Sequence, residues 1–289
     1  MVVCPPFPRP MTRLFVEHLT VIDCAYLDAQ RGLVGESWIV DLELEGALDD
    51  QGMVLDFGEV KKKLKKAVDG IADHKLLVPG EAPELDLVLS GTGSGLSFRA
   101  ATGPIEHQAP ARALCNVPAA AVTAESLAAV IEPALMKAVP ESVSAARVKL
   151  RHEAIAGSYY HYTHGLKKHA GHCQRIAHGH RSKLHVAVNG KRDDRLERLW
   201  AERWRDIYLG TSSDIVSHGK GRIRFEYRSG EGEFELELPA DRCDLLQTDS
   251  TVERIAEHLC AQVAAERPGA KVEVRAYEGV MKGAIATAG

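Results

Sequence analysis

The chain has 289 residues, enough for one large domain or for two of about 140 residues each. Its 45% hydrophobic and 26% charged residues are typical of a globular protein with a sizeable core, and its net charge of −4 gives no global basic field for nucleic acid. No stretch approaches the roughly 18 apolar residues that a membrane helix needs, so we expect neither a nucleic-acid nor a membrane partner.

The N-terminal segment Met1–Pro10 has no charged n-region and no long apolar core, so it does not look like a signal peptide. We expect it to lie outside the fold, with Met11 as a plausible alternative start. The 6 cysteines are far apart in the sequence. Without an export signal, they favour a reduced, cytoplasmic protein over a disulfide framework.

The first half of the chain reads as strands and two helices. Ser37–Glu45 alternates apolar and polar residues and ends at Gly46, which is typical of a half-buried strand. Phe57–Ile71 has apolar residues at helical spacing, and a second helix is predicted from Thr123, a good N-cap residue, to about Ala138. Further strands are predicted over residues 13–21 and 146–150.

The second half repeats this order of elements. The start of its last helix, at Thr251, mirrors the start at Thr123, and its final strand leads to Glu278 as the earlier one leads to Glu153. We predict two units of the α+β class, each an antiparallel sheet with two helices on one face, spanning residues 11–157 and 158–289. In the second unit, strands are predicted over 183–188 and 271–276, a hairpin over 222–227 with 233–238, and helices over 196–208 and 251–265.

The strongest chemical signal is the histidine-rich segment between residues 161 and 185. Residues two apart in a strand point to the same face, so His178 and His180 can reach one metal ion, and His164 supplies a third ligand from the preceding strand. Three neutral imidazoles with an open position form the ligand set of a catalytic zinc site, although copper, iron and nickel also bind imidazole. A histidine-rich surface loop that chelates metal only adventitiously is the alternative.

The order of His164, Cys173 and then His178-Gly179-His180 resembles the zinc-binding signature of the 6-pyruvoyl- and 6-carboxytetrahydropterin synthases, a family with the tunnelling fold. The resemblance implies that the three histidines hold Zn²⁺ and that Cys173 is catalytic. It covers nearly the whole chain, since residues 52–61 look like the family's segment leading into its first helix.

The resemblance also implies further site residues. Asp73 and His74 look like the Asp-His pair that completes the catalytic triad with the cysteine. Glu278 matches the acidic residue that anchors the pterin ring, and Thr251 matches a threonine that lines the pterin pocket. A substrate triphosphate would need basic residues nearby, and a solvated surface is an equal alternative for each of the candidates Lys167, Lys168, Arg175 and Arg181.

Each half lacks part of this pattern. In the first half, Asp23 stands roughly where the first histidine is expected and Val34-Gly35-Glu36 replaces His-Gly-His, which makes a poor zinc site. In the second half, residues 209–216 stand where the Asp-His pair is expected and contain no histidine. Because neighbouring subunits share each site in the family, we predict that the two domains of this chain meet to build one complete site. The alternative is that His74 is structural and that catalysis has been lost.

The resemblance implies a zinc-dependent lyase that converts 7,8-dihydroneopterin triphosphate, or a related dihydropterin, to a 6-pyruvoyl- or 6-carboxytetrahydropterin, the latter on the route to queuosine. A non-catalytic protein that binds a pterin or purine is the alternative. Open sheet edges favour a homo-oligomer, either a dimer or a trimer of the fused chain.

Overall fold

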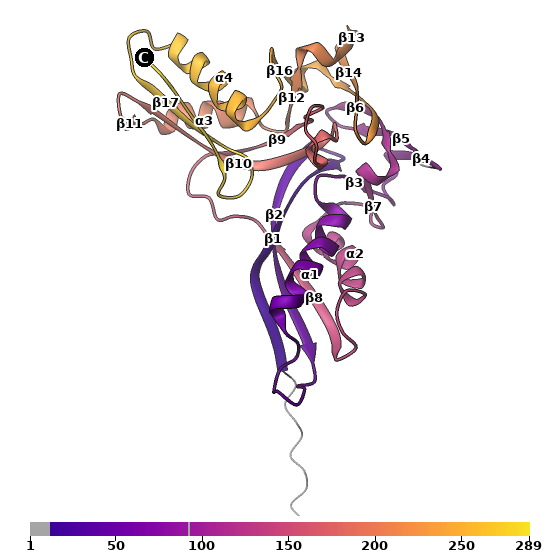
Figure 1. Ribbon diagram of the computed structural model, residues 1–289. Helices are drawn as coiled ribbons and strands as arrows, with labels where there is room; N and C mark the ends of the chain where they lie inside the picture. The colour runs from indigo at the N-terminus through magenta and orange to yellow at the C-terminus, as the bar shows by residue number, and fades with distance from the viewer. Residues whose placement is uncertain (1–11, 92) are drawn as a thin grey trace, which may run out of the picture.

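The computed structural model describes residues 12–91 and 93–289, without the side chain of Glu59, so the predicted N-terminal extension and Met11 lie outside the described residues. The described residues form three sheets and four α-helices (Figure 1). Short 3-10 helices connect some of these elements: η1 (Ala111–Ala113), η2 (His172–Gln174), η3 (Ser212–Asp214) and η4 (Ala240–Arg242).

Five strands from the first half of the chain form the first sheet. Its centre is the antiparallel hairpin of β1 (Thr12–Asp28) and β2 (Gly32–Gly46), both longer than predicted. The other strands are β3 (Leu76–Pro79), β7 (Leu114–Val117) and β8 (Val143–Arg151), and the order across the sheet is β7-β3-β1-β2-β8.

Helices α1 (Phe57–Ala72) and α2 (Ala124–Met136) lie close to their predicted positions. Asp56 caps α1 by accepting a hydrogen bond from the N–H of Gly58, and Thr123 caps α2 in a reciprocal box with Ser126. These side chains satisfy backbone donors that have no partner within the helix, which explains where each helix begins.

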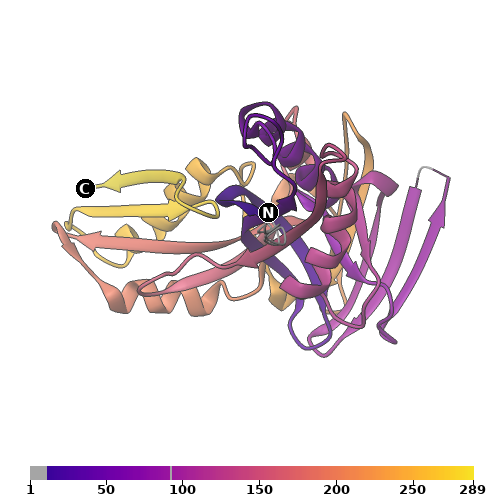
Figure 2. The ribbon, with the colours of Figure 1, turned by 90° about the horizontal axis from the view of Figure 1, so that it is seen from below.

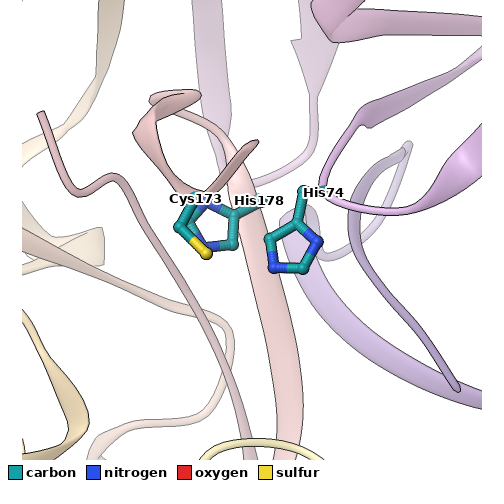
Figure 3. Close-up of side chains that lie close together, drawn as sticks. All are labelled: His74, Cys173 and His178. Atoms are coloured by element: carbon teal, nitrogen blue, oxygen red, sulfur yellow. The ribbon is translucent and has the colours of Figure 1, made fainter. Parts of the chain in front are cut away.

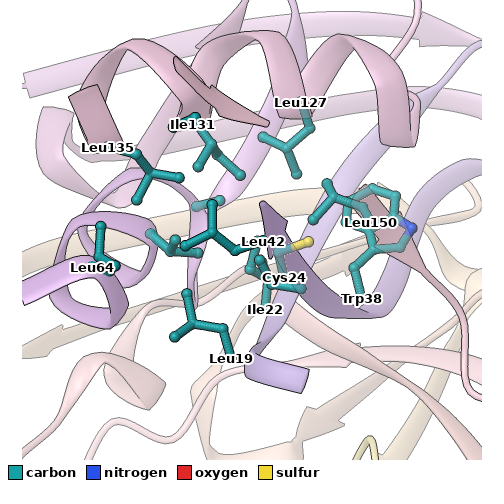
Figure 4. Packing of buried hydrophobic residues seen from close by; sticks show 14 of the residues in the cluster. Leu19, Ile22, Cys24, Trp38, Leu42, Leu64, Leu127, Ile131, Leu135 and Leu150 are labelled. Atoms are coloured by element: carbon teal, nitrogen blue, oxygen red, sulfur yellow. The ribbon is translucent and has the colours of Figure 1, made fainter. Parts of the chain in front are cut away.

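Both helices pack on one face of the first sheet. Leu64 of α1 and Ile131 of α2 meet Ile22 and Leu42 of the hairpin, and all four side chains are almost fully buried (Figure 4). Burial of apolar area is the main driving force for this layer, and deleting one such side chain costs about 2–5 kcal/mol.

The second sheet belongs to the second half of the chain and carries two helices in the same way. Helices α3 (Asp194–Arg203) and α4 (Val252–Ala265) bury Trp200 and Leu259 against it. The strand order is β16-β12-β9-β10-β17-β18, and β11 pairs with β10. The strands are β9 (Tyr159–His164), β10 (His178–Val188), β11 (Lys191–Arg192), β12 (Ile207–Thr211), β16 (Cys243–Leu246), β17 (Val272–Tyr277) and β18 (Gly283–Ala288).

The helix predicted over residues 196–208 ends earlier than expected. Trp204 caps α3, and Asp206 has a φ of 56°, a left-handed conformation that an α-helix does not continue through. Ile207 then begins β12, which pairs in parallel with β9. Pairing within the sheet therefore overrides the helical pattern at this end.

Hairpins from both halves join edge to edge in the third sheet, which the sequence did not predict. Its order is β13-β14-β15-β6-β5-β4, and β15 pairs with β6 where Leu236 lies opposite His107. Its strands are β4 (Leu85–Ser90), β5 (Gly93–Ala100), β6 (Gly103–Pro110), β13 (Ile215–Gly219), β14 (Arg222–Ser229) and β15 (Gly232–Pro239). In Figure 2 the second sheet extends to the left and the β4–β5 hairpin lies at the right.

The first and second sheets approach each other most closely at two glycines. A Cβ atom placed on Gly179 would lie 2.7 Å from Cα of Gly35, and one placed on Gly35 would lie 2.7 Å from the backbone nitrogen of His180. No side chain larger than hydrogen fits at either position. This contact sets the start of β10 directly against β1 and β2.

The predicted α+β class is confirmed, and the first and second sheets each carry a pair of helices. The prediction that each sheet is antiparallel is wrong in part, because β3 pairs in parallel with β1 and β7, and β12 pairs in parallel with β9 and β16. These short strands follow a helix or a 3-10 helix, so the chain returns to the sheet in the same direction. No helix within the described ranges is both long enough and apolar enough to cross a membrane.

Candidate active site

Three histidines on neighbouring strands converge on one point of the second sheet. His164 ends β9 and pairs directly with His178 at the start of β10, and His180 follows on the same face. All three are buried, and one ring nitrogen of each lies within 4.8 Å of the others. The structure therefore brings together the three residues that the sequence predicted as metal ligands.

The Nδ1 atoms of His164 and His178 are held from outside this cluster, and that of His180 lies near a charged group. Nδ1 of His164 donates to the backbone carbonyl of Ser250 at 2.9 Å, and Nδ1 of His178 donates to that of Arg175 at 2.9 Å. Nδ1 of His180 faces a carboxylate at 3.2 Å. An Nδ1–H held in this way leaves the Nε2 lone pair directed into the cluster, as in metal-bound histidines.

The cluster fits a cation. Buried Nε2 of His178 has no hydrogen-bond partner among the described residues, and the Nε2 atoms of His164 and His180 are 3.3 Å apart. Burial, followed by the neighbouring histidines, lowers the pKa of His164 and His178 well below its usual value, so both rings are neutral, as metal ligands must be. Three imidazoles suit zinc, and they also suit copper, iron or nickel.

The carboxylate beside His180 belongs to Asp23 on β1, in the other half of the chain. It accepts hydrogen bonds from Oγ of Ser37 at 2.5 Å and from Nζ of Lys282 at 3.2 Å, and it lies 3.2 Å from Nδ1 of His180. Burial works to raise the pKa of Asp23, but His180 and Lys282 outweigh it and hold the pKa well below its usual value. Asp23 is thus an ionised group that orients His180, a role that sequence reasoning missed because it considered this residue only as a replaced ligand.

Asp73 and His74 follow α1 and are fixed against β1. The Asp73 carboxylate accepts from the N–H of Asp23 at 3.0 Å and lies 2.8 Å from Nδ1 of His74. The N–H of His74 donates to the carbonyl of Asp23 at 2.7 Å, and its φ of 53° turns the chain away from the helix. Asp73 therefore sets the orientation of the His74 ring.

His74 reaches the histidine cluster from the first half of the chain. Potential ligand atoms of His74, Cys173 and His178 lie within 4.8 Å of one another, and the two imidazole centroids are 5.0 Å apart. Figure 3 shows His74 on a segment of the first half, with Cys173 and His178 on segments of the second. Residues from the two halves of the chain therefore lie close together beside the histidine cluster.

Electrostatics couple His74 to the cysteine. Burial works to lower the pKa of His74, but Asp73 and Cys173 raise it to about 10. His74 is therefore an imidazolium at neutral pH.

The segment that carries Cys173 is clamped by residues that sequence reasoning did not identify as a unit. Glu231, in the turn between β14 and β15, accepts from Nε of Arg175 at 2.8 Å and from Nδ1 of His172 at 2.7 Å. Nη1 of the buried Arg175 donates to the carbonyl of His74 at 3.4 Å. One guanidinium thus ties the cysteine segment both to the hairpin and to His74. A single acidic residue in a hairpin turn gives no sequence signal for this contact.

The other basic residues considered for phosphate already have partners. Lys167 pairs with Asp214, Lys168 pairs with Asp249, and Arg181 donates to a backbone carbonyl. None of these contacts distinguishes a phosphate site from an ordinary charged surface.

Glu278 follows β17 and borders the cluster. Its carboxylate lies 4.0 Å from Nε2 of His180 and 3.8 Å from Nζ of Lys282, and its side chain is 22% exposed. It is therefore placed where a molecule at the metal position could contact it.

Thr251 caps α4 by accepting from the N–H of Arg254, and the residue before it, Ser250, holds His164. Thr251 lines a pocket of about 380 Å³ with Lys168. The three cluster histidines do not line this pocket, and a larger pocket of about 1070 Å³ lies on the third sheet.

The first half contains a structural counterpart of the histidine cluster. Gly35 and Gly179 are equivalent, and their cross-strand partners are Ala25 and Thr163. This register makes Tyr26 the counterpart of His164, Val34 that of His178 and Glu36 that of His180. A phenol, a valine and one carboxylate do not form a zinc site, as the sequence indicated.

The register corrects three expected equivalences. Asp23 does not replace the first histidine, because Tyr26 occupies that position in the strand pairing. The counterpart of Glu278 is His152 and not Glu153, because Val40 pairs with Leu150 as Leu184 pairs with Ala276. The counterpart of His74 is Asp206, which has the same left-handed φ directly after a helix, so residues 209–216 are not equivalent to the Asp-His pair.

Comparison with known proteins gives one family. Residues 24–163 match the family model described as 6-pyruvoyl tetrahydropterin synthase. The matched range contains Asp73 and His74 and ends directly before His164. No curated protein matches the chain closely enough to count as a relative.

The similar solved structures come from Plasmodium. A catalytic-residue mutant of the Plasmodium vivax 6-pyruvoyltetrahydropterin synthase is 23% identical, with a TM-score of 0.40 over 49% of this chain and 91% of that chain. Another structure of the Plasmodium vivax enzyme is 22% identical, with a TM-score of 0.38 over 49% and 98% of the two chains. The Plasmodium falciparum 6-pyruvoyl tetrahydropterin synthase is 23% identical, with a TM-score of 0.36 over 44% and 79%.

Proposed function

Since residues 24–163 match the family model of the 6-pyruvoyl tetrahydropterin synthases, we propose that this chain is a metal-dependent lyase acting on a dihydropterin. The proposed substrate is 7,8-dihydroneopterin triphosphate or a close relative, and the product is a 6-pyruvoyl- or 6-carboxytetrahydropterin. The proposed metal is zinc, held by His164, His178 and His180.

The observation that supports catalysis is the approach of His74 to Cys173 and His178 across the two halves. A structural histidine would need only the bonds that fix it to β1. Here the ring is also turned toward a cysteine and a histidine cluster on the other half, and Asp73 fixes its direction. This arrangement favours a working site over a purely structural role for His74.

In the proposed reaction, Cys173 takes a proton from the substrate's side-chain carbon as a thiolate. The protonated His74 stabilises that thiolate and can return a proton to the developing product, while Asp73 keeps its ring in place. A bound zinc ion would supply Lewis acidity to the side-chain oxygens of the substrate.

The proposed role of Glu278 is to hold the pterin ring. A carboxylate offers two acceptor oxygens in one plane, which match the amino and ring N–H donors along one edge of a pterin. Its position beside His180 places the ring next to the metal position. Thr251 is proposed to contact the substrate from the start of α4, next to Ser250, which holds His164, although the pocket that it lines does not include Glu278.

We also propose two domains, 11–157 and 158–289, and a homo-oligomer of the fused chain. In the described residues, β8 and β18 end their sheets with an unpaired edge, and such edges are commonly covered by another subunit. Light scattering coupled to size exclusion tests the oligomer, with a dimer or trimer expected.

The decisive experiment is incubation of the zinc-loaded protein with 7,8-dihydroneopterin triphosphate, followed by mass spectrometry of the products. A pterin with an altered side chain supports the lyase, and its mass identifies the branch. Cys173→Ala is expected to abolish turnover while retaining zinc. The matched variant Cys243→Ala, at a half-buried cysteine on β16, is expected to retain both turnover and zinc. Tight pterin binding without turnover in the metal-replete unmutated protein would instead establish a binding protein.

A further inference from the structure

An arginine lies beside the first-half counterpart of the histidine cluster. Nη1 of Arg31 donates to the hydroxyl of Tyr26 at 3.0 Å, and its Nε and Nη2 donate to the carboxylate of Asp206 at 3.0 and 2.5 Å. Tyr26 and Asp206 are the counterparts of His164 and His74. These two residues hold the guanidinium in one orientation.

This guanidinium opens onto a pocket between the halves. The pocket has a volume of about 430 Å³ and is lined by residues from the β1–β2 turn, the start of β9 and α3. Arg31 keeps two of its five N–H groups uncommitted, and its side chain is 37% exposed. The orientation set by Tyr26 and Asp206 leaves it able to bind an anion without rearrangement.

Two further arginines line the same pocket. Arg198 on α3 and Arg205 after it are exposed, and neither has an ion-pair partner within the described part of the chain. Glu202 is the single acidic side chain among the described lining residues. Three arginines thus line one hollow, and guanidinium groups bind phosphate through charge-assisted hydrogen bonds.

His161 adds a hydrogen-bond acceptor to the wall of the pocket. It is 9% exposed and lines the pocket, and its Nδ1 donates to the carbonyl of Gly35 at 2.6 Å. Burial lowers the pKa of His161, so the ring is neutral and its Nε2 is an acceptor. No hydrogen bond to that Nε2 is found within residues 12–91 and 93–289. A bare phosphate oxygen would meet a lone pair there, whereas a hydroxyl or N–H group would satisfy it.

We propose that this pocket is a second ligand site, separate from the histidine cluster, for a small phosphate monoester that carries a hydroxyl or N–H group near the phosphate. The phosphate binds Arg31, Arg198 and Arg205, and the donor group binds Nε2 of His161. The site does not depend on the proposed lyase activity, since it shares no residue with that site.

The test is isothermal titration calorimetry of the zinc-loaded protein with glycerol 3-phosphate and with inorganic phosphate. Glycerol 3-phosphate is expected to bind more tightly than phosphate, because only it brings hydroxyl donors. The double variant Arg198→Ala/Arg205→Ala is expected to weaken both probes by at least about tenfold, since both residues are exposed and each supplies charge-assisted hydrogen bonds. Arg195→Ala, an exposed arginine on the same helix outside the pocket, is expected to bind both probes as the unmutated protein does.

A second variant separates the two parts of the proposal. His161→Phe removes the acceptor, so it is expected to abolish the preference for glycerol 3-phosphate while phosphate affinity persists. Circular dichroism melting confirms that each variant is folded. The proposal is overturned if neither probe binds the unmutated protein at millimolar concentration. It is equally overturned if binding survives the double arginine variant, or if it is lost in His178→Ala, which would assign the phosphate to the metal site.

Discussion

The strand pairs around Gly179 and Gly35 have equivalent backbone pairing but carry different side chains. Around Gly179, three histidines face one point and the carboxylates of Asp23 and Glu278 lie beside them. Around Gly35, the equivalent of the last histidine is a buried carboxylate, Glu36, and histidines stand beside it. A carboxylate therefore stands where the other half has a histidine, and histidines stand near it instead of carboxylates. Both halves share the strand register, the glycine contact and a left-handed residue after their first helix, His74 after α1 and Asp206 after α3.

The comparison shows how one complete site can arise from two partial ones. The second half carries the three proposed metal ligands and Cys173, whereas Asp23 beside His180 and His74 beside Cys173 come from the first half. The first half has no such histidine cluster at the equivalent position within the described residues, and Arg31 there bonds Tyr26 and Asp206. Loss in one half is therefore compatible with a working site, provided that the two halves stay in contact.

The largest expected effect is on zinc content, which should depend on the histidines around Gly179 and not on those around Gly35. His178→Ala is expected to reduce bound zinc from about one ion per chain to far below that and to abolish turnover, because three protein ligands are the minimum for a catalytic zinc site. Metal analysis after dialysis measures this. His152→Ala, at the equivalent crossing of the first half, is the matched control and is expected to keep the ion. An unchanged metal content in His178→Ala would contradict the assignment.

The next effect tests whether the halves share a catalytic site. His74→Ala is expected to lower kcat by about 10²–10⁴-fold with zinc content unchanged, since that is the usual contribution of a general acid or base. Steady-state kinetics with parallel metal analysis measures it. His218→Ala, an exposed histidine on β13, is the control. If kcat is unchanged in His74→Ala, the composite site is wrong.

Asp23 tests the orienting role of the first half. Asp23→Asn keeps the shape but removes the charge beside His180, and loss of such an outer partner typically weakens metal binding by about 10–100-fold. Competition with a zinc chelator gives the affinity. Asp41→Asn, which removes another partly buried carboxylate from an ion pair with Arg151, is expected to leave zinc affinity unchanged.

A smaller effect is expected at the clamp on the cysteine segment. Glu231→Ala frees Arg175 and His172, so kcat should fall by about tenfold, the equivalent of about 1.4 kcal/mol, with little change in KM. Arg112→Ala removes a more exposed partner of the same carboxylate and is the control. A change confined to KM would assign Glu231 to substrate binding instead.

The smallest effect concerns the sheet that joins the halves. His107 is buried at the β6–β15 pairing, and burial lowers its pKa to about 4. The unfolded chain therefore binds a proton at this histidine below about pH 6.5, whereas the folded protein does so only below about pH 4. As the pH drops through this range, the free energy of unfolding is expected to fall by roughly 3 kcal/mol at most. Urea unfolding at both ends of this range measures the loss. His107→Leu should show a smaller loss, and an equal loss would place the pH sensitivity elsewhere.

Much of the local structure could be predicted because its causes lie within a few residues. The alternation in Ser37–Glu45, the caps at Thr123 and Thr251 and the spacing of His178 and His180 each follow from backbone geometry over one or two turns or strand steps. The family resemblance rested on the same short motifs. Helix ends were less predictable, since the end of α3 depends on the pairing of Ile207 with a distant strand.

The repeated α+β order and the convergence of three histidines follow from the sequence pattern, and the pairing of Asp73 with His74 follows from the family resemblance. The positions of Asp23 beside His180, of Tyr26 opposite Val34 and of Arg31 against Tyr26 and Asp206 became clear only in the folded structure. These facts depend on the register of long strands and on a contact between two glycines 144 residues apart, Gly35 and Gly179. Such long-range contacts are selected by the packing of whole sheets, and no short stretch of sequence encodes them.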